Sequence, residues 1–348
     1  MSQTAEVLIR CDDLAPTLRF FTQELGFRIE TIFPADDPKV ASLSGHGLRL
    51  RLEPGVGEAG TLRIPLESEG SQPRSLAAPN GTRIEFVDPD PPIEVPPLQS
   101  EFIVTRVGDG PGAGEGRAGM LYRDLIPGRL GGRFIASHIA IPEGGPVSDW
   151  VHFHKIRFQM IFCRQGWARL VYEDQGEPFL MRAGDCVLQP PRIRHRVLES
   201  SPAFEVVELG CPALHETLAD HAMTLPTGRL DRERDYGGQR FLHAVAADTP
   251  WTASAYPDFE VRGTGMARAT AGLADCRTVR PAGATGFSAT PFAGELMFGF
   301  LLAGSASLDC RGAHALGPAD AFVIPAGEAW GINGASADLE LLQVELPA

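Results

Sequence analysis

Two histidines separated by a single residue, His152 and His154, form the pair in this chain whose spacing is best suited to chemistry. A third histidine, His195, ends a segment that begins with Gly184 and Asp185. In an extended strand, side chains at positions i and i+2 project from the same face, so His152 and His154 can offer two imidazole nitrogens to one ion. Neutral imidazole is a ligand for zinc, iron, copper and nickel. The three histidines are therefore predicted to bind one divalent metal ion.

The sequence around these histidines resembles the paired motifs of the cupin superfamily. His152, His154, Gln159 and a glycine at position 166 have the spacing of the first motif, and residues 184–195 have the spacing of the second. The resemblance implies that the three histidines converge inside a small β-barrel. It also places Gln159 where cupins usually carry a glutamate ligand. Gln159 is therefore the candidate catalytic residue, as a hydrogen-bond partner of substrate or as a weak fourth ligand, with a purely structural role as the alternative.

The neutral charge of these four side chains bears on the substrate. Three neutral imidazoles and the Gln159 amide would leave a divalent ion with its full positive charge. Such an ion favours an anion at its open positions. We therefore expect a small anionic or chelating substrate. Two nearby arginines, Arg157 and Arg194, are weaker candidates for a carboxylate clamp, and Tyr172, Glu173 and Glu199 are weak candidates for a general base.

The elements that must position the site are short strands. Between Gly119 and Glu208, apolar runs alternate with Gly, Pro and acidic turns, which predicts an all-β barrel. The following segment, 211–221, is expected to be more helical and to seal one mouth of the barrel. His215 and His221 within it are expected to be surface or packing residues.

The last third of the chain repeats this pattern without the histidines. Residues 159–166 align with 297–304, and residues 185–195 align with 320–330 without a gap. Every expected ligand position is lost, because the residues at the aligned positions are Thr290, Phe292, Met297 and Trp330. An internal repeat of this kind predicts a second barrel of the same fold. We expect this second barrel to be degenerate and metal-free.

The N-terminal segment has a different pattern. A strand at 7–11, a helix at 14–25 and strands at 28–33 and 48–52 give a β-α-β-β order. Residues 12–27 and 81–89 resemble the opening module and closing strand of the glyoxalase and bleomycin-resistance (vicinal oxygen chelate) fold. Glu6 and Glu85 take positions where that family has ligands, but neither is a histidine, and a structural or dimerising role is favoured.

These patterns predict a mainly β protein with three domains in 348 residues. The expected domains are a small α+β glyoxalase-like segment (1–95), a metal-binding cupin barrel (96–225) and a degenerate cupin barrel (226–348). The boundary after the first domain is drawn at the Pro-rich residues 91–97 and the Gly-rich residues 108–116, which disfavour regular structure.

Composition restricts the partners and the location. The formal net charge of -13 argues against binding to nucleic acid or an anionic membrane surface. No signal peptide and no apolar run long enough to cross a bilayer is recognised. The six cysteines include no CxxC pair and are expected to be reduced. The prediction is a cytoplasmic protein that acts on a small-molecule substrate, with assembly into a homodimer left open.

Cupin resemblance favours a non-haem iron(II) dioxygenase, in which substrate chelates the metal and O2 binds beside it. Mn, Ni, Zn and Cu remain alternative ions for this ligand set. Two alternatives stay open at this point. One is metal-assisted lyase, isomerase or hydrolase chemistry without O2, and the other is a ligand-binding bicupin with no catalytic activity.

Overall fold

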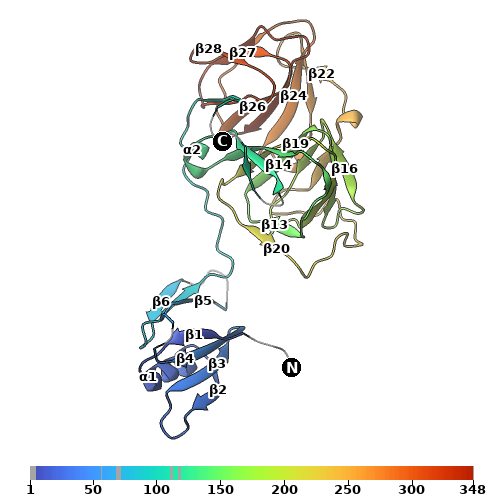
Figure 1. Cartoon of the computed structure of the whole chain (residues 1–348). Helices are drawn as coiled ribbons and strands as arrows, with labels where there is room; N and C mark the ends of the chain where they lie inside the picture. The colour runs from blue at the N-terminus through green and yellow to red at the C-terminus, as the bar shows by residue number, and fades with distance from the viewer. Residues whose placement is uncertain (1–4, 56, 68–71, 110–112, 117–118, 348) are drawn as a thin grey trace. The chain divides into compact units, whose positions relative to one another are not determined.

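The computed structural model describes residues 5–55, 57–67, 72–109, 113–116 and 119–347. The chain divides into two compact units, Met1–Pro92 and Ile93–Ala348. The structure is mainly β, as the sequence predicts (Figure 1). Within the described residues, no helix is both long and apolar enough to cross a lipid bilayer.

The N-terminal unit has one helix packed on a four-stranded sheet of order β1-β4-β3-β2. Its β1 and β4 run parallel, and the other neighbours run antiparallel. A smaller sheet follows in the order β5-β7-β6. The elements are β1 (Val7–Arg10), α1 (Leu14–Arg19), the π-helix η1 (Phe20–Glu24), β2 (Arg28–Phe33), β3 (Val40–Gly45), β4 (Leu48–Glu53), β5 (Thr61–Pro65), β6 (Arg74–Ala77) and β7 (Arg83–Val87).

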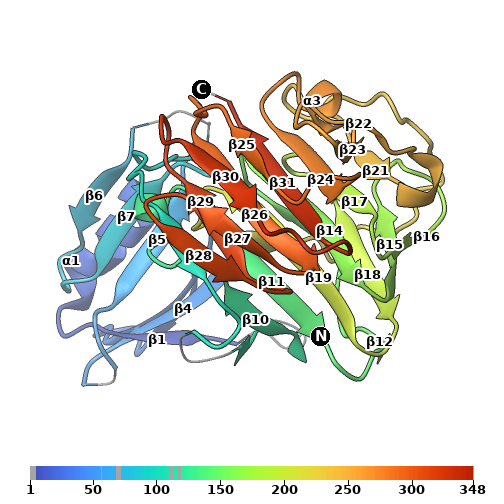
Figure 2. The same cartoon turned by 90° about the horizontal axis from the view of Figure 1, so that it is seen from above.

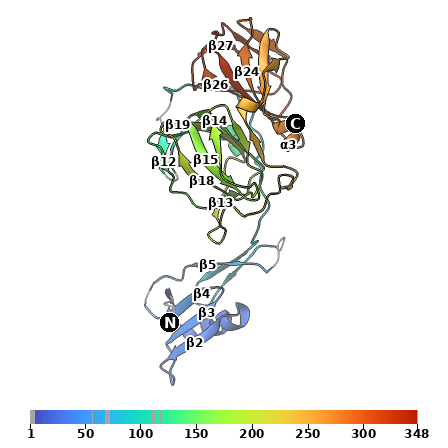
Figure 3. The same ribbon diagram turned by 90° about the vertical axis from the view of Figure 1, so that its right-hand side faces the viewer.

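The first barrel of the larger unit consists of two sheets, in the orders β21-β17-β14-β19-β11-β10-β9 and β16-β15-β18-β13-β20, with β12 paired to β18 (Figure 3). Its strands are β9 (Gly114–Glu115), β10 (Leu121–Asp124), β11 (Ile135–Ile141), β12 (Gly145–Pro146), β13 (His152–His154), β14 (Phe158–Gln165), β15 (Trp167–Tyr172), β16 (Phe179–Arg182), β17 (Cys186–Leu188), β18 (His195–Ser200), β19 (Phe204–Cys211), β20 (Thr217–Ala219) and β21 (Leu242–Ala244). The short helix α2 (Arg129–Gly132) precedes β11.

The second barrel has sheets of order β22-β23-β24-β31-β26-β29-β8 and β25-β30-β27-β28 (Figure 2). Its elements are β8 (Ile103–Thr105), the 3-10 turn η3 (Ala246–Asp248), β22 (Thr252–Ala253), β23 (Phe259–Gly263), α3 (Met266–Ala269), β24 (Asp275–Pro281), β25 (Phe287–Ala289), β26 (Leu296–Ala303), β27 (Ala306–Asp309), β28 (Ala313–Leu316), β29 (Ala321–Ile324), β30 (Trp330–Asn333) and β31 (Glu340–Leu346). The barrels exchange edge strands, because β8 pairs with β29 of the second barrel and β21 pairs with β17 of the first.

Alternation along β14 explains how the fold aims one side chain at the site. Phe158, Met160 and Phe162 belong to a core that also contains β26 and β31 of the second barrel. The intervening residues Gln159 and Ile161 line the interior pocket of the first barrel. Successive strand residues face opposite sides of a sheet. Both faces of β14 are therefore buried, which accounts for its nearly continuous apolar sequence.

The internal repeat predicted from the sequence is present in the turns of both barrels. Gly166 and Gly304 end the equivalent strands β14 and β26 with positive φ values of 74° and 73°. A Cβ atom at Gly166 would clash with Ser201 Oγ, and one at Gly304 would lie 2.6 Å from the Leu339 backbone. Only glycine combines this left-handed conformation with so close an approach at low cost. The same backbone requirement has thus kept glycine in both copies.

Two details of the barrels differ from expectation. Residues 217–219, expected to be helical, form strand β20, which pairs with the histidine strand β13. Without β20, the N–H and C=O groups on this edge of β13 would have no sheet partner, and pairing satisfies them. In the second barrel, Ala289 pairs with Trp330 just as His152 pairs with His195. The sequence repeat assigned Thr290 to the position of His152. The strand register places the preceding residue, Ala289, there instead.

Candidate metal centre

Strand pairing brings the three predicted histidines together inside the first barrel. His152 and His154 lie on β13, and His195 begins β18, directly opposite His152. Ligand nitrogens of the three side chains all lie within 4.8 Å of one another. All three side chains are buried, with exposed fractions of 1%, 8% and 6%. Across the described residues, no other group of histidine, cysteine or carboxylate side chains has this geometry.

Hydrogen bonds at the back of each imidazole fix its tautomer. His152 Nδ1 lies 2.8 Å from the Trp150 carbonyl, and His195 Nδ1 lies 3.0 Å from the Ile193 carbonyl. A carbonyl oxygen only accepts, so each Nδ1 carries the proton and each Nε2 keeps a lone pair. Metal-ligating histidines are usually held in this way. Both rings are therefore prepared to bind through Nε2.

The third imidazole receives its support from β20. His154 Nδ1 lies 3.3 Å from the Glu216 carbonyl and 3.3 Å from Thr217 Oγ1. These contacts leave Nε2 of His154 as the ligand nitrogen by the same argument. The segment expected to be a helix is thus a strand that orients a candidate ligand. His215 lies beside it, with its ring centroid 5.3 Å from that of His154, but does not belong to the three-histidine group.

A chain of two side chains holds His195 from the pocket side. The Tyr172 hydroxyl donates to Gln189 Oε1 at 3.1 Å, and Gln189 Nε2 donates to His195 Nε2 at 3.0 Å, a hydrogen bond that a bound metal ion would replace. The Tyr172 ring also stacks on the His195 ring with centroids 5.4 Å apart. Burial, with a smaller contribution from the Glu208 carboxylate, raises the pKa of the Tyr172 phenol above its usual value. Tyr172 is therefore a neutral hydrogen-bond donor at this site.

Gln159 lies in the same pocket and has a partner that the sequence did not reveal. Its Nε2 donates to Glu208 Oε1 on the neighbouring strand β19 at 3.0 Å. An ionised carboxylate only accepts hydrogen bonds, so this contact fixes which end of the Gln159 amide faces Glu208. The opposite end, Gln159 Oε1, is buried and has no hydrogen-bond partner among the described residues. The amide therefore presents an unused acceptor inside the barrel.

The remaining pocket wall is mostly apolar. Its lining combines the polar residues described above and the Arg196 side chain with a larger set of aliphatic, sulfur-containing and aromatic side chains: Met120, Tyr122, Ile139, Ile141, Ile161, Leu170, Met181, Val197, Phe204 and Val206. Ligand sites are commonly apolar cavities with a few precisely placed polar groups. The arrangement suits a small substrate with an apolar body and one polar end directed at the histidines.

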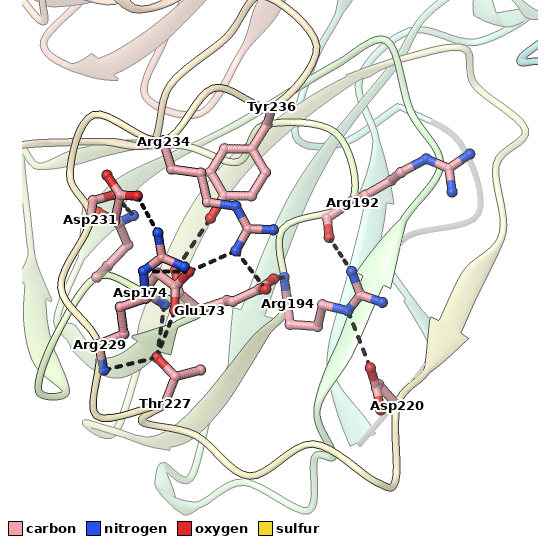
Figure 4. Close-up of polar contacts among 11 residues, drawn as sticks. Glu173, Asp174, Arg192, Arg194, Asp220, Thr227, Arg229, Asp231, Arg234 and Tyr236 are labelled. Atoms are coloured by element: carbon pink, nitrogen blue, oxygen red, sulfur yellow. Dashed lines mark hydrogen bonds and ion pairs between the residues drawn. The ribbon is translucent and has the colours of Figure 1, made fainter.

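The two candidate clamp arginines lie in other contacts. Arg157 pairs with Glu295 of the second barrel at 2.8 Å. Arg194 donates to Asp220 at 3.2 Å, as Figure 4 shows, and its guanidinium lies 4.2 Å from the Phe153 ring centroid. Neither arginine is part of the pocket lining. A neighbour of a ligand on a strand faces the other side of the sheet, which explains the position of Arg194.

Two of the three candidate bases form ion pairs outside the pocket. Glu173 accepts from Arg234 at 2.7 Å, within a network that ties the segment after β20 to the turn between β15 and β16 (Figure 4). Glu199 pairs with Arg169 at 3.0 Å. Only Tyr172 lines the pocket, together with the unexpected carboxylate of Glu208.

Glu208 also corrects the charge balance of the site. The sequence suggested four neutral side chains around the ion, but the Glu208 carboxylate is hydrogen-bonded to one of them. A divalent ion would therefore share the pocket with the Glu208 carboxylate and with the oppositely charged Arg196 side chain. One signal in the sequence pointed to this residue, since Glu208 is in phase with Phe204 and Val206, which face the same pocket.

Comparisons with known proteins support the fold. No protein-family model matches the sequence, and no curated protein matches it. Among solved structures, salicylate 1,2-dioxygenase from Pseudaminobacter salicylatoxidans is similar, with a TM-score of 0.52 and 16% identity over 72% of this chain and 85% of that chain. A point mutant of Bacillus subtilis oxalate decarboxylase OxdC has a TM-score of 0.51 and 11% identity, over 71% and 78% of the two chains. Protein Ylba from E. coli has a TM-score of 0.50 and 10% identity, over 71% and 90%.

These similar structures have the cupin fold. The larger unit of this chain is accordingly a pair of cupin-type barrels, which confirms the predicted fold class. Sequence identities of 10% to 16% establish the fold alone. Any activity must therefore be argued from the side chains of this chain.

Proposed function

We propose that this protein is a metal-dependent cupin enzyme, a non-haem iron(II) dioxygenase acting on a small anionic or chelating substrate. The convergence of His152, His154 and His195 on a mostly apolar pocket is the observation that supports the proposal most strongly. Their Nε2 lone pairs form a neutral donor set that fits Fe(II), and also fits Mn, Ni, Zn or Cu. Bound iron would supply the one-electron chemistry that O2 requires.

The residues of the chain position the reactants around this centre. The Ile193 carbonyl orients the His195 ring through Nδ1, and the Tyr172 ring stacks on it. Glu208 holds the amide of Gln159 so that Oε1 stays available to a substrate hydroxyl or to the ion. The apolar wall excludes water, which strengthens electrostatic interactions inside the pocket and limits side reactions. Because the charges of Glu208 and Arg196 in the pocket lining are opposite, the charge of a bound ion is left for a small anionic or chelating substrate to balance.

The proposal is tested by turnover with and without oxygen. Protein reconstituted with Fe(II) would be screened against small hydroxy acids and diketones while dissolved O2 is recorded. We expect stoichiometric consumption of O2 with a converted substrate and no turnover under argon. Equal turnover under air and argon would reject the dioxygenase assignment. The His152→Ala, His154→Ala double variant is the matched control and should consume no O2 above the buffer rate.

A second candidate is metal-assisted lyase, isomerase or hydrolase chemistry, and the position of Glu208 favours it. Such chemistry needs a general base as well as an ion that polarises a carbonyl. The Glu208 carboxylate lines the pocket and is half-buried, so it could accept a substrate proton. In this case turnover would continue under argon and would be lost in a Glu208→Gln variant.

For the N-terminal unit we propose a non-catalytic glyoxalase-like module. The β1-α1-β2-β3-β4 order and the sheet order β1-β4-β3-β2 support the likeness. Both glutamates at family ligand positions are engaged in ion pairs, Glu6 with Arg49 at 2.7 Å and Glu85 with Arg63 at 3.1 Å. Substitution of Glu6 by Gln should therefore leave the metal content unchanged, which elemental analysis would show.

A further inference from the structure

The second barrel has lost its ligands but keeps a pocket at the corresponding place. Trp330, Met297 and Ala289 line this pocket, at the positions that His195, Gln159 and His152 occupy in the first barrel. A barrel that had become purely structural would be expected to fill this space with side chains. The pocket persists with a different set of lining residues, which indicates that it binds a different kind of ligand.

Aromatic rings form the walls of this pocket. Tyr256 and Trp330 stand nearly perpendicular, at 80°, with ring centroids 6.4 Å apart. Phe287 stacks on one face of Tyr256 at 3.8 Å and holds that ring in position. Phe292, which is half-buried, lines the pocket as well. Ring faces carry the negative part of the aromatic quadrupole, so a corner built from such rings attracts cations.

The charged groups beside these rings place a carboxylate at the pocket wall. Arg277 donates to Asp275 at 3.1 Å and to Gln343 at 3.1 Å, and it also pairs with Glu345. The charge of Arg277 is therefore compensated by two carboxylates, of which Glu345 lines the pocket and Asp275 does not. Arg277 and Glu345 both line the pocket, and their side chains are 24% and 21% exposed. Because Arg277 is already paired, Glu345 is the charged lining residue able to attract a positively charged group.

The chemistry of the lining suits an organic cation better than a metal ion. Within the described residues, the only group of His, Cys, Asp and Glu side chains with metal-binding geometry is that of the first barrel. Aromatic faces with a nearby carboxylate are the usual surroundings of a bound ammonium group. We propose that the second barrel binds a small organic ammonium ion, an amine or quaternary ammonium group on a compact apolar body. This site is separate from the metal centre and does not depend on it.

The test compares a cation with a neutral molecule of the same shape. Choline and 3,3-dimethylbutan-1-ol differ only in whether the central atom is a charged nitrogen or a carbon. Binding would be measured by calorimetry on the full chain carrying His152→Ala and His154→Ala, which removes the first site. We expect saturable binding of choline, with the neutral alcohol at least about tenfold weaker. Equal binding of the two, or no binding of choline at millimolar concentration, would overturn the proposal.

Two substitutions then locate the bound cation. Glu345→Gln keeps the size of the side chain and removes one carboxylate, and should weaken choline binding about tenfold. Phe292→Leu removes an aromatic face near the pocket rim and should weaken it severalfold, which keeps the test valid if the first variant is unstable. Choline affinity that is unchanged in both folded variants would show that the cation binds elsewhere and would contradict the proposal.

Discussion

The two barrels of this chain share their strand order but differ in what stands at the centre. In the first, histidine Nε2 lone pairs converge beside the Gln159 and Glu208 pair. In the second, the indole of Trp330 occupies the position of His195, and Gln343 pairs opposite Gly299 just as Glu208 pairs opposite Ile161. The glycine after β14 and β26 and the turn aspartate are common to both. Asp185 accepts from the Arg182 N–H and Asp320 from the Gly317 N–H, each at 2.8 Å.

This difference separates what the fold requires from what chemistry requires. The glycine that follows β14 and β26 is the same in the two barrels, because a Cβ atom would clash at Gly166 and at Gly304. Positions that face the barrel centre are free to change, because their side chains contribute packing or chemistry rather than backbone conformation. Residues that are present in one barrel and absent from the other are therefore the best candidates for function.

The largest expected effect separates packing from metal binding at one matched position. Trp330→Ala should lower the free energy of unfolding by about 3–5 kcal/mol, because it leaves a cavity in the core of the second barrel. Its metal content should not change. His195→Ala should abolish metal binding. In metal-free protein, it should lower the free energy of unfolding much less than Trp330→Ala does. Chemical denaturation and elemental analysis of both variants would measure this. A loss of metal in the Trp330 variant while it remains folded would contradict the separation.

A smaller effect is expected at the Gln159 and Glu208 pair. Glu208→Gln replaces a group that only accepts hydrogen bonds by an amide that can also donate, so the Gln159 amide loses its fixed orientation. Metal affinity should fall about tenfold to a hundredfold, in line with other groups that orient a metal site. Competition with a fluorescent chelator would measure the affinity. The matched control is Gln343→Leu in the second barrel, which should leave the affinity unchanged, and equal values for all three proteins would exclude an orienting role.

The smallest effect concerns the ion pairs that join the barrels. Glu295 lies 2.7 Å from Arg133 and 2.8 Å from Arg157. Burial alone would raise the pKa of Glu295, but the hydrogen bonds from these arginines lower it below its usual value. A lowered pKa in the folded protein means stability that is present at neutral pH and is lost as the pH falls below 4.5 toward the folded-state pKa.

Glu295→Gln should therefore cost about 1–3 kcal/mol of unfolding free energy at pH 7 and progressively less as the pH falls below 4.5. Urea denaturation at several pH values would measure the difference between the variant and the natural protein. A difference that does not change with pH would show that the charge of Glu295 contributes nothing to joining the barrels.

Much of the fold and part of the site could be predicted from the sequence. The histidines are found because alternation along a strand and motif spacing are local properties of the chain. Glu208 is 49 residues from Gln159, and their contact depends on the register between β14 and β19, which no local pattern specifies. The strand at 217–219 was missed for a related reason, since its three residues are ordered by pairing with β13 rather than by their own pattern.

The central claim is that the first barrel binds a metal ion and the second does not. Elemental mass spectrometry of freshly purified, tag-free protein tests it most directly, beside the His152→Ala, His154→Ala double variant. We predict close to one ion per chain, with iron favoured, and loss of that ion in the double variant. Two ions per chain, or an ion retained when both histidines are removed, would contradict the account.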